Sequence, residues 1–579
     1  MFRKLFSILL TLTLLCALLP VHAEAAMEEK TVPLYMSSLE YEDEIRLVFP
    51  DGQTDIPYIS AEEMCRAMNL IWHDFGEDED FHITLHDQNP NALLERENGT
   101  DAYIDFENGM VSFGQYDKFF ALSGSANMLD LIAIGGMKKN EEAEVDLLLH
   151  NHVFECNGTD TAVNLQDYNI PSPVVNGVGY LPLQTFSDLF VSAAGIALCY
   201  NGDLVALATT SSFKDDLEQL TGLGELYYSA PIRPRSEALA EFTLNELCLA
   251  LDFHYGLKEE HGIDNFRDYF IRSGLVTDLL DPDAQVSTAA LAKLCMNHFS
   301  DNHSALMAAS PYMDQAEPLL SFESMSLGQF ERIANTGTYY AARGAFYPES
   351  VPGYEEIGNT AYVTFDTFML DPEKDYYAGE SSDEEYTSMT DDVIGLLIYA
   401  NQQIHRENSP IENVVIDLSN NGGGIADVAV SVCCWALDLS SVNVQDMNSG
   451  ARSVTLYAFD ANLNHVFYES EDNISDKNLF CLISPLSFSC GNLVPATLKA
   501  SGKVTLLGKA STGGTCIVQL LSTADGTLFA VSGRKRVNTV NNGVFYSVDE
   551  GVEPHYYLPR AEMFYDRQKL TDYINSLIW

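Results

Sequence analysis

Residues 359–579 alternate between short apolar runs and longer amphipathic stretches. Short runs rich in β-branched residues predict strands, and apolar residues at helical spacing predict helices. The expected strands lie at 360–365, 414–418, 479–483, 504–507, 517–521 and 528–531, and the expected helices at 391–405, 425–437, 493–500 and 567–577. Strands that alternate with helices are typical of an α/β core around a central sheet.

The preceding segment, residues 211–320, carries its apolar positions at helical spacing. Leu217, Leu220 and Leu223 would share one helix face, and residues 244–251 and 291–299 supply two more. Prolines and glycines separate these stretches, as expected for short connections between helices. The pattern predicts a small helical bundle.

Residues 26–210 contain two similar units, each with the pattern of a short strand, a helix and a hairpin. The first unit lies at 55–85 and the second at 179–208. The second unit resembles the copper amine oxidase N-terminal-like domain, a small α+β module common on exported bacterial envelope proteins. This resemblance implies contact of the N-terminal region with the cell envelope. It implies no metal site, because the histidines here lack a regular ligand spacing.

The first 25 residues have the order of a secretory signal peptide. Arg3 and Lys4 precede an apolar stretch at 5–19, and Ala23 and Ala25 offer small-residue cleavage sites. A membrane anchor is the alternative, but the stretch is short for a membrane span. We therefore expect a secreted or cell-envelope-associated bacterial protein without an integral membrane span after cleavage.

Composition narrows the class of protein further. The 579 residues exceed the size of one core, and the net charge of −53 argues against a nucleic-acid partner. The cysteines show no CxxC spacing, and most stand in apolar runs, so we expect buried thiols and no metal site. The expected domains are a signal peptide at 1–25, an α+β region at 26–210, the bundle at 211–320 and the α/β core at 321–579.

Two strand-to-helix junctions could carry chemistry. The apolar strand at 414–418 runs into Gly422, Gly423 and Gly424, and glycines at a helix start let backbone amides approach a developing negative charge. At the second junction, Ser489 would place its hydroxyl beside the amide of Cys490. A simple helix N-cap is the competing interpretation of Ser489.

Together these segments resemble the tail-specific protease family, which includes carboxyl-terminal processing peptidases and the tricorn protease core. Residues 416–424 resemble the family's strand-plus-glycines signature, and Ser489 stands at the second serine of its Ser-x-Ser, the nucleophile. Further landmarks follow in order at 502–508, 511–514 and 551–554. The resemblance covers roughly residues 240–579 and implies a ClpP/crotonase-like α/β serine peptidase core.

The general base departs from the pattern of the processing peptidases. These enzymes use a lysine that would align with Gly514, and Lys509 stands where the family usually has an acidic residue. The tricorn-like branch has Gly-Gly at this point and takes a histidine from the helical bundle. Residues 301–304, Asp-Asn-His-Ser, resemble that segment, which implies His303 as the base. Imidazole suits this role because its pKa lies near neutrality.

A carboxylate must orient such a histidine. The tricorn-like branch takes it from just before the Gly-Val-Asp/Glu-Pro landmark, where Asp549 and Glu550 are equal candidates here. The resemblance thus implies hydrolysis of polypeptides through an acyl-enzyme on Ser489. Amides of Gly423 or Gly424 and of Cys490 would hold the oxyanion, and no cofactor is needed.

Two alternatives remain open. The chain could keep the peptidase fold without activity and bind peptides or cell-wall components. Cys490 could be the nucleophile, although it adjoins the family's serine rather than replacing it. The 56 residues between His303 and Thr360 are also too few for a full peptide-binding PDZ domain.

Overall fold

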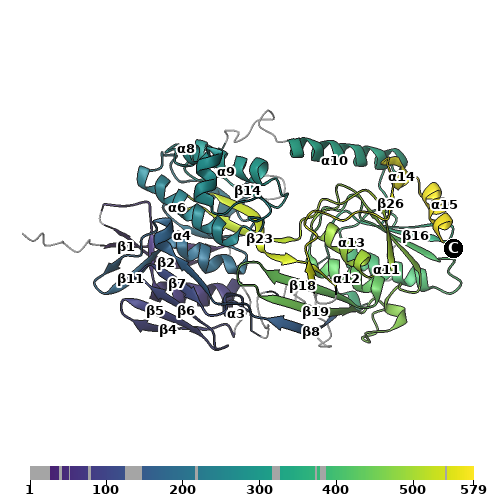
Figure 1. Ribbon diagram of the computed structural model, residues 1–579, viewed down its shortest axis with the longest axis horizontal. Helices are drawn as coiled ribbons and strands as arrows, with labels where there is room; N and C mark the ends of the chain where they lie inside the picture. The colour runs from purple at the N-terminus through teal and green to yellow at the C-terminus, as the bar shows by residue number, and fades with distance from the viewer. Residues whose placement is uncertain are drawn as a thin grey trace, which may run out of the picture.

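The computed structural model describes residues 27–578, with gaps at 38, 40–41, 51, 76–79, 124–128, 130–146, 215–218, 316–326, 372–373, 379–385 and 542–543. The expected signal peptide lies outside the described residues. The molecule is elongated, with the N-terminal sheets and the helical bundle at one end and the C-terminal core at the other (Figure 1). Within the described ranges, no helix combines the length and apolar character needed to cross a bilayer.

A seven-stranded sheet lies near the N-terminus, in the order β10-β11-β3-β2-β1-β13-β12. Its strands are β1 (Met27–Met36), β2 (Glu42–Pro50), β3 (Tyr58–Ser60), β10 (Val174–Val175), β11 (Val178–Pro182), β12 (Ala197–Tyr200) and β13 (Val205–Ala208). The helices α2 (Ala61–Leu70) and α4 (Leu183–Leu189) follow β3 and β11 directly. These two strands pair antiparallel, so the two similar units meet through equivalent strands.

The first unit departs from its predicted pattern after the helix. The pattern predicts a hairpin after the helix, but Ile71–Phe75 form a π-helical turn that continues α2. The reason is spacing, because Met64, Met68 and Ile71 form one buried helical stripe. The chain then enters a separate five-stranded sheet, ordered β4-β5-β6-β7-β9. Its strands are β4 (Ile83–Gln88), β5 (Asn91–Arg96), β6 (Asp101–Asp105), β7 (Met110–Phe113) and β9 (Thr161–Asn164), and the short α3 (Tyr116–Phe119) follows β7.

The predicted bundle consists of α5 (Gly222–Tyr227), α6 (Glu237–His254), α7 (Phe266–Ser273), α8 (Leu275–Leu279), α9 (Ala284–Lys293) and the π-helical η5 (Leu294–Phe299). Side chains cap the N-termini of four of these helices, at Thr221, Ser236, Asn265 and Asp283. Such caps satisfy amides that have no partner within the helix. After η5 the chain turns through His303 into β14 (Ala305–Ala308).

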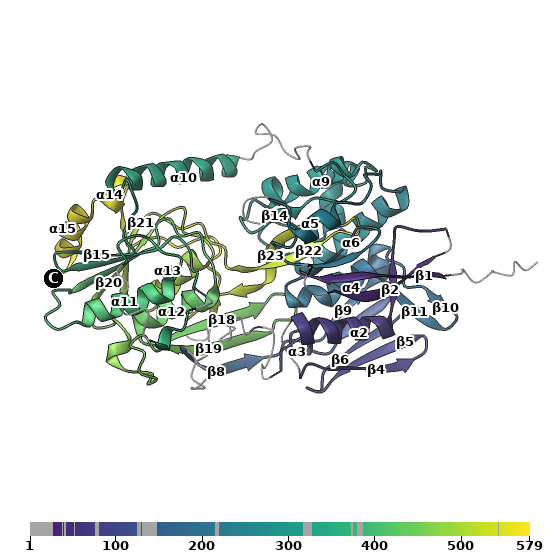
Figure 2. The same cartoon turned by 180° about the vertical axis from the view of Figure 1, so that it is seen from behind.

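A six-stranded sheet joins the two ends of the molecule. It contains β8 (Leu148–Cys156), β14, β18 (Ser440–Asp446), β19 (Arg452–Phe459), β22 (Cys516–Ser522) and β23 (Leu528–Val537). In both views β8, β18 and β19 run between the two halves (Figure 1, Figure 2). Because β14 pairs with β23, with Ala305 opposite Ala530, the segment that carries His303 is fixed to the C-terminal part of the chain.

The C-terminal core is built on the sheet β15-β16-β17-β20-β21-β26, which is parallel from β16 onward. Its strands are β15 (Tyr354–Ile357), β16 (Thr360–Thr364), β17 (Asn413–Asp417), β20 (Asn478–Ile483), β21 (Val504–Gly508) and β26 (Tyr556–Tyr557). A hairpin of β24 (Thr539–Asn541) and β25 (Val544–Tyr546) precedes β26.

Helices cover both faces of this core sheet. Val414 and Ile416 pack with α11 (Val393–His405), α12 (Ala426–Leu437) and α13 (Cys490–Ala500). Val415, between them in sequence, packs on the other side with α14 (Glu562–Tyr565), α15 (Arg567–Leu577) and the end of α10 (Leu327–Phe346). Alternate strand residues thus enter opposite layers, and the predicted multidomain fold with an α/β core is confirmed.

Candidate active site

Ser489 occupies a sharp turn between β20 and α13. Its backbone has φ 57° and ψ −123°, a region that side chains rarely adopt and that costs on the order of 1–3 kcal/mol. The Ser489 amide donates to the Gly513 carbonyl at 2.9 Å, and the Ser487 hydroxyl donates to the Leu418 carbonyl at 2.7 Å. Surrounding contacts therefore hold the strained turn in place.

The Ser489 side chain does not cap the helix that it precedes. Among the described residues no hydrogen-bond partner contacts its hydroxyl, and the residue is partly exposed. The N-cap interpretation of Ser489 is therefore wrong, because a cap would use this oxygen to accept from the helix amides. The turn leaves the hydroxyl available for chemistry.

The three consecutive glycines lie directly against this turn. A Cβ atom on Gly423 would come within 2.7 Å of Ser489 Cβ and 3.1 Å of its Oγ. Gly423 and Gly424 have φ values of 113° and 139°, and a Cβ on Gly424 would clash with the Phe368 carbonyl at 2.4 Å. Glycine is thus required both by conformation and by the close approach to Ser489.

The amides that could hold an oxyanion are not equivalent. The Gly423 amide donates to the Asn421 side-chain oxygen at 2.9 Å. In the described part of the chain, neither the Gly424 amide nor the Cys490 amide has an acceptor. Of the three predicted donors, Gly424 and Cys490 are the two that remain free.

His303 contacts Phe488, the residue directly before Ser489. The His303 and Phe488 rings lie 4.6 Å apart between centroids, at an angle of 55°. His303 Nδ1 is buried without a hydrogen-bond partner, and no hydrogen bond joins His303 to Ser489 among the described residues. Burial lowers the pKa of His303, while Asp301 and Asp549 act in the opposite direction.

Phe488 also accounts for the missing lysine. A Cβ atom on Gly514 would lie 2.2 Å from Cε2 of the Phe488 ring, so no side chain fits there. Phe488 fills the space beside position 514, and its ring packs against His303. Lys509, the other lysine considered, points its ammonium toward the Tyr339 ring at 6.0 Å.

The two candidate acids differ in their surroundings. Asp549 raises the pKa of His303 by its charge, which places the two groups within electrostatic range. Its Oδ1 also accepts from the Thr515 amide at 2.8 Å, which fixes the carboxylate. Glu550 is exposed and lines a hollow beside Phe488. Asp549 thus acts on His303 through its charge, whereas Glu550 lies at the surface.

Cys490 is poorly suited to nucleophilic attack. Its thiol is buried and donates to the Gly424 carbonyl at 3.2 Å. Burial is the main cause that raises the pKa of Cys490 to about 12, so the thiolate is disfavoured near neutral pH. All ten cysteines in the described ranges are free, and eight of them are buried.

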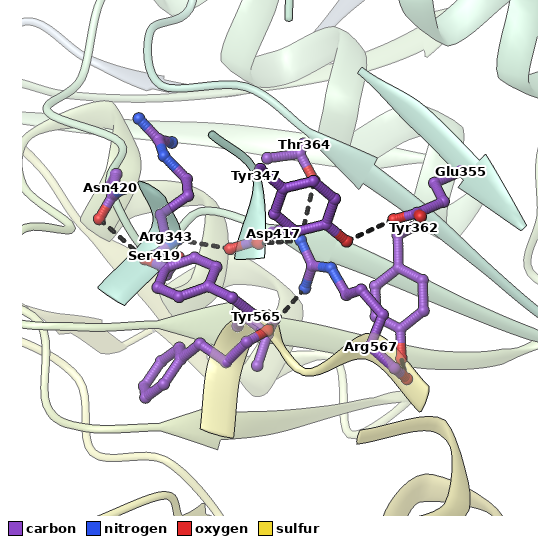
Figure 3. A network of polar contacts seen from close by, with 12 residues as sticks. Arg343, Tyr347, Glu355, Tyr362, Thr364, Asp417, Ser419, Asn420, Tyr565 and Arg567 are labelled. Atoms are coloured by element: carbon purple, nitrogen blue, oxygen red, sulfur yellow. Dashed lines mark hydrogen bonds and ion pairs between the residues drawn. The ribbon is translucent and has the colours of Figure 1, made fainter. Parts of the chain in front are cut away.

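Beneath the glycine loop lies a buried polar network (Figure 3). Arg567 donates to Asp417 at 2.5 Å and to the Thr364 hydroxyl at 3.2 Å. The Tyr565 hydroxyl lies 3.3 Å from the Ser419 hydroxyl and 3.2 Å from the Asn420 side chain. The network ties the end of β17 and the start of the glycine loop to α14 and α15.

A hollow of about 550 Å³ opens beside the Ser489 turn. Phe488, Gly422 and Thr512 line it from the core, and Arg332 and Tyr340 line it from α10. Sequence reasoning identified neither these α10 residues nor Phe488. The motifs at 301–304, 422–424, 487–489 and 511–514, together with Glu550, signalled this part of the site. No cluster of three metal-ligating side chains occurs within the described ranges.

Comparison with known families decides the class of the core. Residues 361–558 match the family model of peptidase family S41. This segment is an S41 peptidase domain. The resemblance to carboxyl-terminal processing peptidases is therefore confirmed, and the domain is that of a serine peptidase acting on polypeptides. The resemblance of the N-terminal region to copper amine oxidase N-terminal-like domains stays a prediction.

Several solved structures resemble the chain remotely. A candidate peptidase from Parabacteroides merdae is 15% identical over 59% of this chain and 97% of its own, with a TM-score of 0.41. A lipoprotein from Streptococcus agalactiae is 15% identical over 60% and 98%, with a TM-score of 0.33. A photosystem II D1 C-terminal processing protease is 19% identical over 35% and 43%, with a TM-score of 0.24. No curated protein sequence matches the chain.

Proposed function

We propose that the protein is an exported serine endopeptidase that cleaves peptide bonds through an acyl-enzyme on Ser489. The observation that carries this proposal is the strained Ser489 turn, whose hydroxyl is uncommitted and packed against Gly423. Serine hydrolases benefit from such a turn, because it exposes the nucleophile beside backbone amides.

His303 acts as the general base in this proposal, with Asp549 as its orienting acid. Ser489 Oγ bonds to the substrate carbonyl carbon while its proton passes to His303. His303 then gives the proton to the leaving amine as the C–N bond breaks, and water releases the acyl group. Asp549 is preferred to Glu550 because its charge acts on His303. The proposal requires a side-chain rotation of His303 that brings an imidazole nitrogen to the Ser489 hydroxyl.

The amides of Gly424 and Cys490 hold the oxyanion. Both lie at the junction where the glycine loop meets the start of α13, and neither has another acceptor among the described residues. Preorganised amides at such a position stabilise the charge that develops on the substrate oxygen. The Gly423 amide would first have to leave Asn421.

The proposal that the protein is exported rests on the order of basic, apolar and small residues at 1–25. We place the mature protein outside the bacterial cytoplasm, secreted or associated with the cell envelope, with the N-terminal region as the part that contacts the envelope. Detection of a chain that begins after Ala23 or Ala25 in the extracellular fraction would support this placement.

A fluorophosphonate probe tests the proposed nucleophile directly. We expect folded protein to be labelled at Ser489, with labelling lost in Ser489→Ala and reduced by about 10²–10⁴ in rate in His303→Ala. Lys509→Ala should keep most of the labelling, because its ammonium faces Tyr339. Peptide mapping by mass spectrometry identifies the labelled residue.

The opposite results would change the assignment. Labelling that survives His303→Ala and disappears in Lys509→Ala would make the lysine the base. Absence of any labelling in folded protein would favour a peptide-binding protein that keeps the fold without the activity.

A further inference from the structure

Helix α10 carries Arg332 at the edge of the hollow beside the proposed active site. Arg332 lines both the 550 Å³ hollow next to Phe488 and a second hollow of about 390 Å³ formed with η5 and β14. The two hollows share Ser300, Asn302 and Arg332, so Arg332 stands at their junction. Among the described residues, it is the only lysine or arginine that lines either hollow.

The guanidinium of Arg332 has no acceptor within the described residues. Partial burial lowers its pKa although much of the residue is exposed, and Asp301 acts in the opposite direction. The Asp301 carboxylate is itself occupied, because it accepts from the Ser304 amide at 2.7 Å and the Ser304 hydroxyl at 2.8 Å. The donors of Arg332 are therefore available to a ligand in the hollow.

The placement of α10 favours a role in binding rather than in folding. In Figure 1 the helix extends along the top of the molecule from the bundle side to α14. Its second half is anchored by buried Tyr339 and by Arg343, while Phe330 and Ile333 in the first half are 37% and 53% exposed. Arg332 lies in this exposed half, where it contributes little to the core.

We propose that Arg332 binds a carboxylate of the peptide substrate and so determines which peptides are cleaved. This inference deepens the proposed peptidase function and rests on it. The planar guanidinium can donate two parallel hydrogen bonds to a carboxylate, and no other common side chain does so equally well. Glu331 and Glu550 line the same hollow, and the chain carries a net charge of −53, so the guanidinium of Arg332 is the group there that offsets repulsion of an incoming carboxylate.

The carboxylate could come from an aspartate or glutamate side chain or from the peptide C-terminus. A synthetic library separates these sources. In the first comparison, Asp or Glu at each successive position is paired with Asn or Gln at the same position. In the second, each peptide with a free C-terminal acid is paired with the same peptide carrying a C-terminal amide. The ratio of kcat/KM between acid and amide peptides is measured for the wild type, Arg332→Gln, Arg332→Lys and Arg272→Gln.

We expect the wild type to prefer a carboxylate at one fixed distance from the cleaved bond. Arg332→Gln should reduce that acid-to-amide ratio by roughly 10- to 100-fold, as expected for loss of a charged hydrogen-bonding partner. Arg332→Lys should keep part of the preference, because it retains the charge without the bidentate geometry. Arg272→Gln removes an exposed cation on α7 outside both hollows and should leave the ratio unchanged.

A binding measurement in the Ser489→Ala background separates this inference from the proposed function. The same library is passed over immobilised Ser489→Ala protein and Ser489→Ala/Arg332→Gln protein, and the retained peptides are identified by mass spectrometry. Retention of carboxylate peptides that depends on Arg332 supports the inference even if no peptide is cleaved. If acid and amide peptides are cleaved or retained equally well, the inference about Arg332 is overturned. It is also overturned if no peptide is either cleaved or retained.

Discussion

At the scale of single residues, proton transfer in the proposed mechanism depends on how the surroundings of His303 set its pKa. The partly buried ring packs against Phe488, and burial lowers the pKa of His303 below its ordinary value of 6.5. A lowered pKa keeps the imidazole neutral, which is the form that accepts a proton from serine. Asp549 opposes this shift because its negative charge stabilises the imidazolium.

The pH dependence of cleavage follows from this balance. The acid limb of kcat/KM reports the base of the free enzyme, so we expect its midpoint below pH 6.5. Asp549→Asn should move the midpoint to still lower pH, because the imidazolium loses a stabilising charge. It should also lower kcat, because His303 loses its orienting partner.

Glu550→Gln is the matched control, since it removes the neighbouring carboxylate at the surface. Its acid limb should coincide with that of the wild type. A shift in Glu550→Gln without one in Asp549→Asn would assign the orienting role to Glu550 instead.

At the scale of elements, the α/β core was predictable and α10 was not. The strands of the core are short apolar runs between helices, and β17, β20 and β21 lie within one residue of their predicted bounds. Helix α10 contains Gly337 and Gly344, two residues that disfavour helices, and its first half buries no continuous apolar stripe. Periodicity cannot reveal a helix that has no core-facing side along half its length.

The site was predictable to a similar extent. Its glycines, Ser489 and His303 stand in short motifs that can be recognised from neighbouring residues in the sequence. The role of Phe488 depends on contacts with Gly514 and His303, which are far apart in sequence, so no local pattern could signal it.

The anchor of α10 gives a prediction for this element. Arg343 donates to both carboxylate oxygens of Asp366, at 2.8 and 2.7 Å, and the Asp366 carbonyl accepts from the Gly422 amide at 3.1 Å. Arg343→Ala leaves Asp366 partly buried without its partner, so we expect a loss of about 2–4 kcal/mol in the free energy of unfolding. Denaturant unfolding measures this loss.

Arg406→Ala provides the comparison, because Arg406 pairs with Glu356 near the surface. Exposed ion pairs contribute less than about 1 kcal/mol, so this variant should unfold close to the wild type. Equal losses in the two variants would show that the Arg343–Asp366 pair is no stronger an anchor than a surface contact.

At the scale of the whole molecule, a buried carboxyl pair lies where three parts of the chain meet. Asp188 belongs to α4 of the N-terminal region and Glu246 to α6 of the bundle, and Gln184 donates both to Asp188 and to the Ser522 carbonyl of β22, each at 2.9 Å. The Thr185 hydroxyl donates to Glu246 at 2.5 Å. Burial raises the pKa of Glu246 to about 8, and burial and the charge of Glu246 raise the pKa of Asp188.

This pair makes the stability of the whole assembly depend on pH. A raised pKa means that the folded state binds protons that the unfolded state has already released. Stability from Glu246 is therefore complete below pH 4.5 and falls as the pH rises toward about 8.

Glu246→Gln removes this titration, so the variant should match the wild type at pH 5 and be more stable at pH 8, by on the order of a few kcal/mol. Thermal melting at both pH values measures the difference, with exposed Glu237→Gln on the same helix as control. If wild type and Glu246→Gln lose the same stability between these pH values, the junction does not titrate through Glu246, and the contacts among α4, α6 and β22 are insensitive to pH.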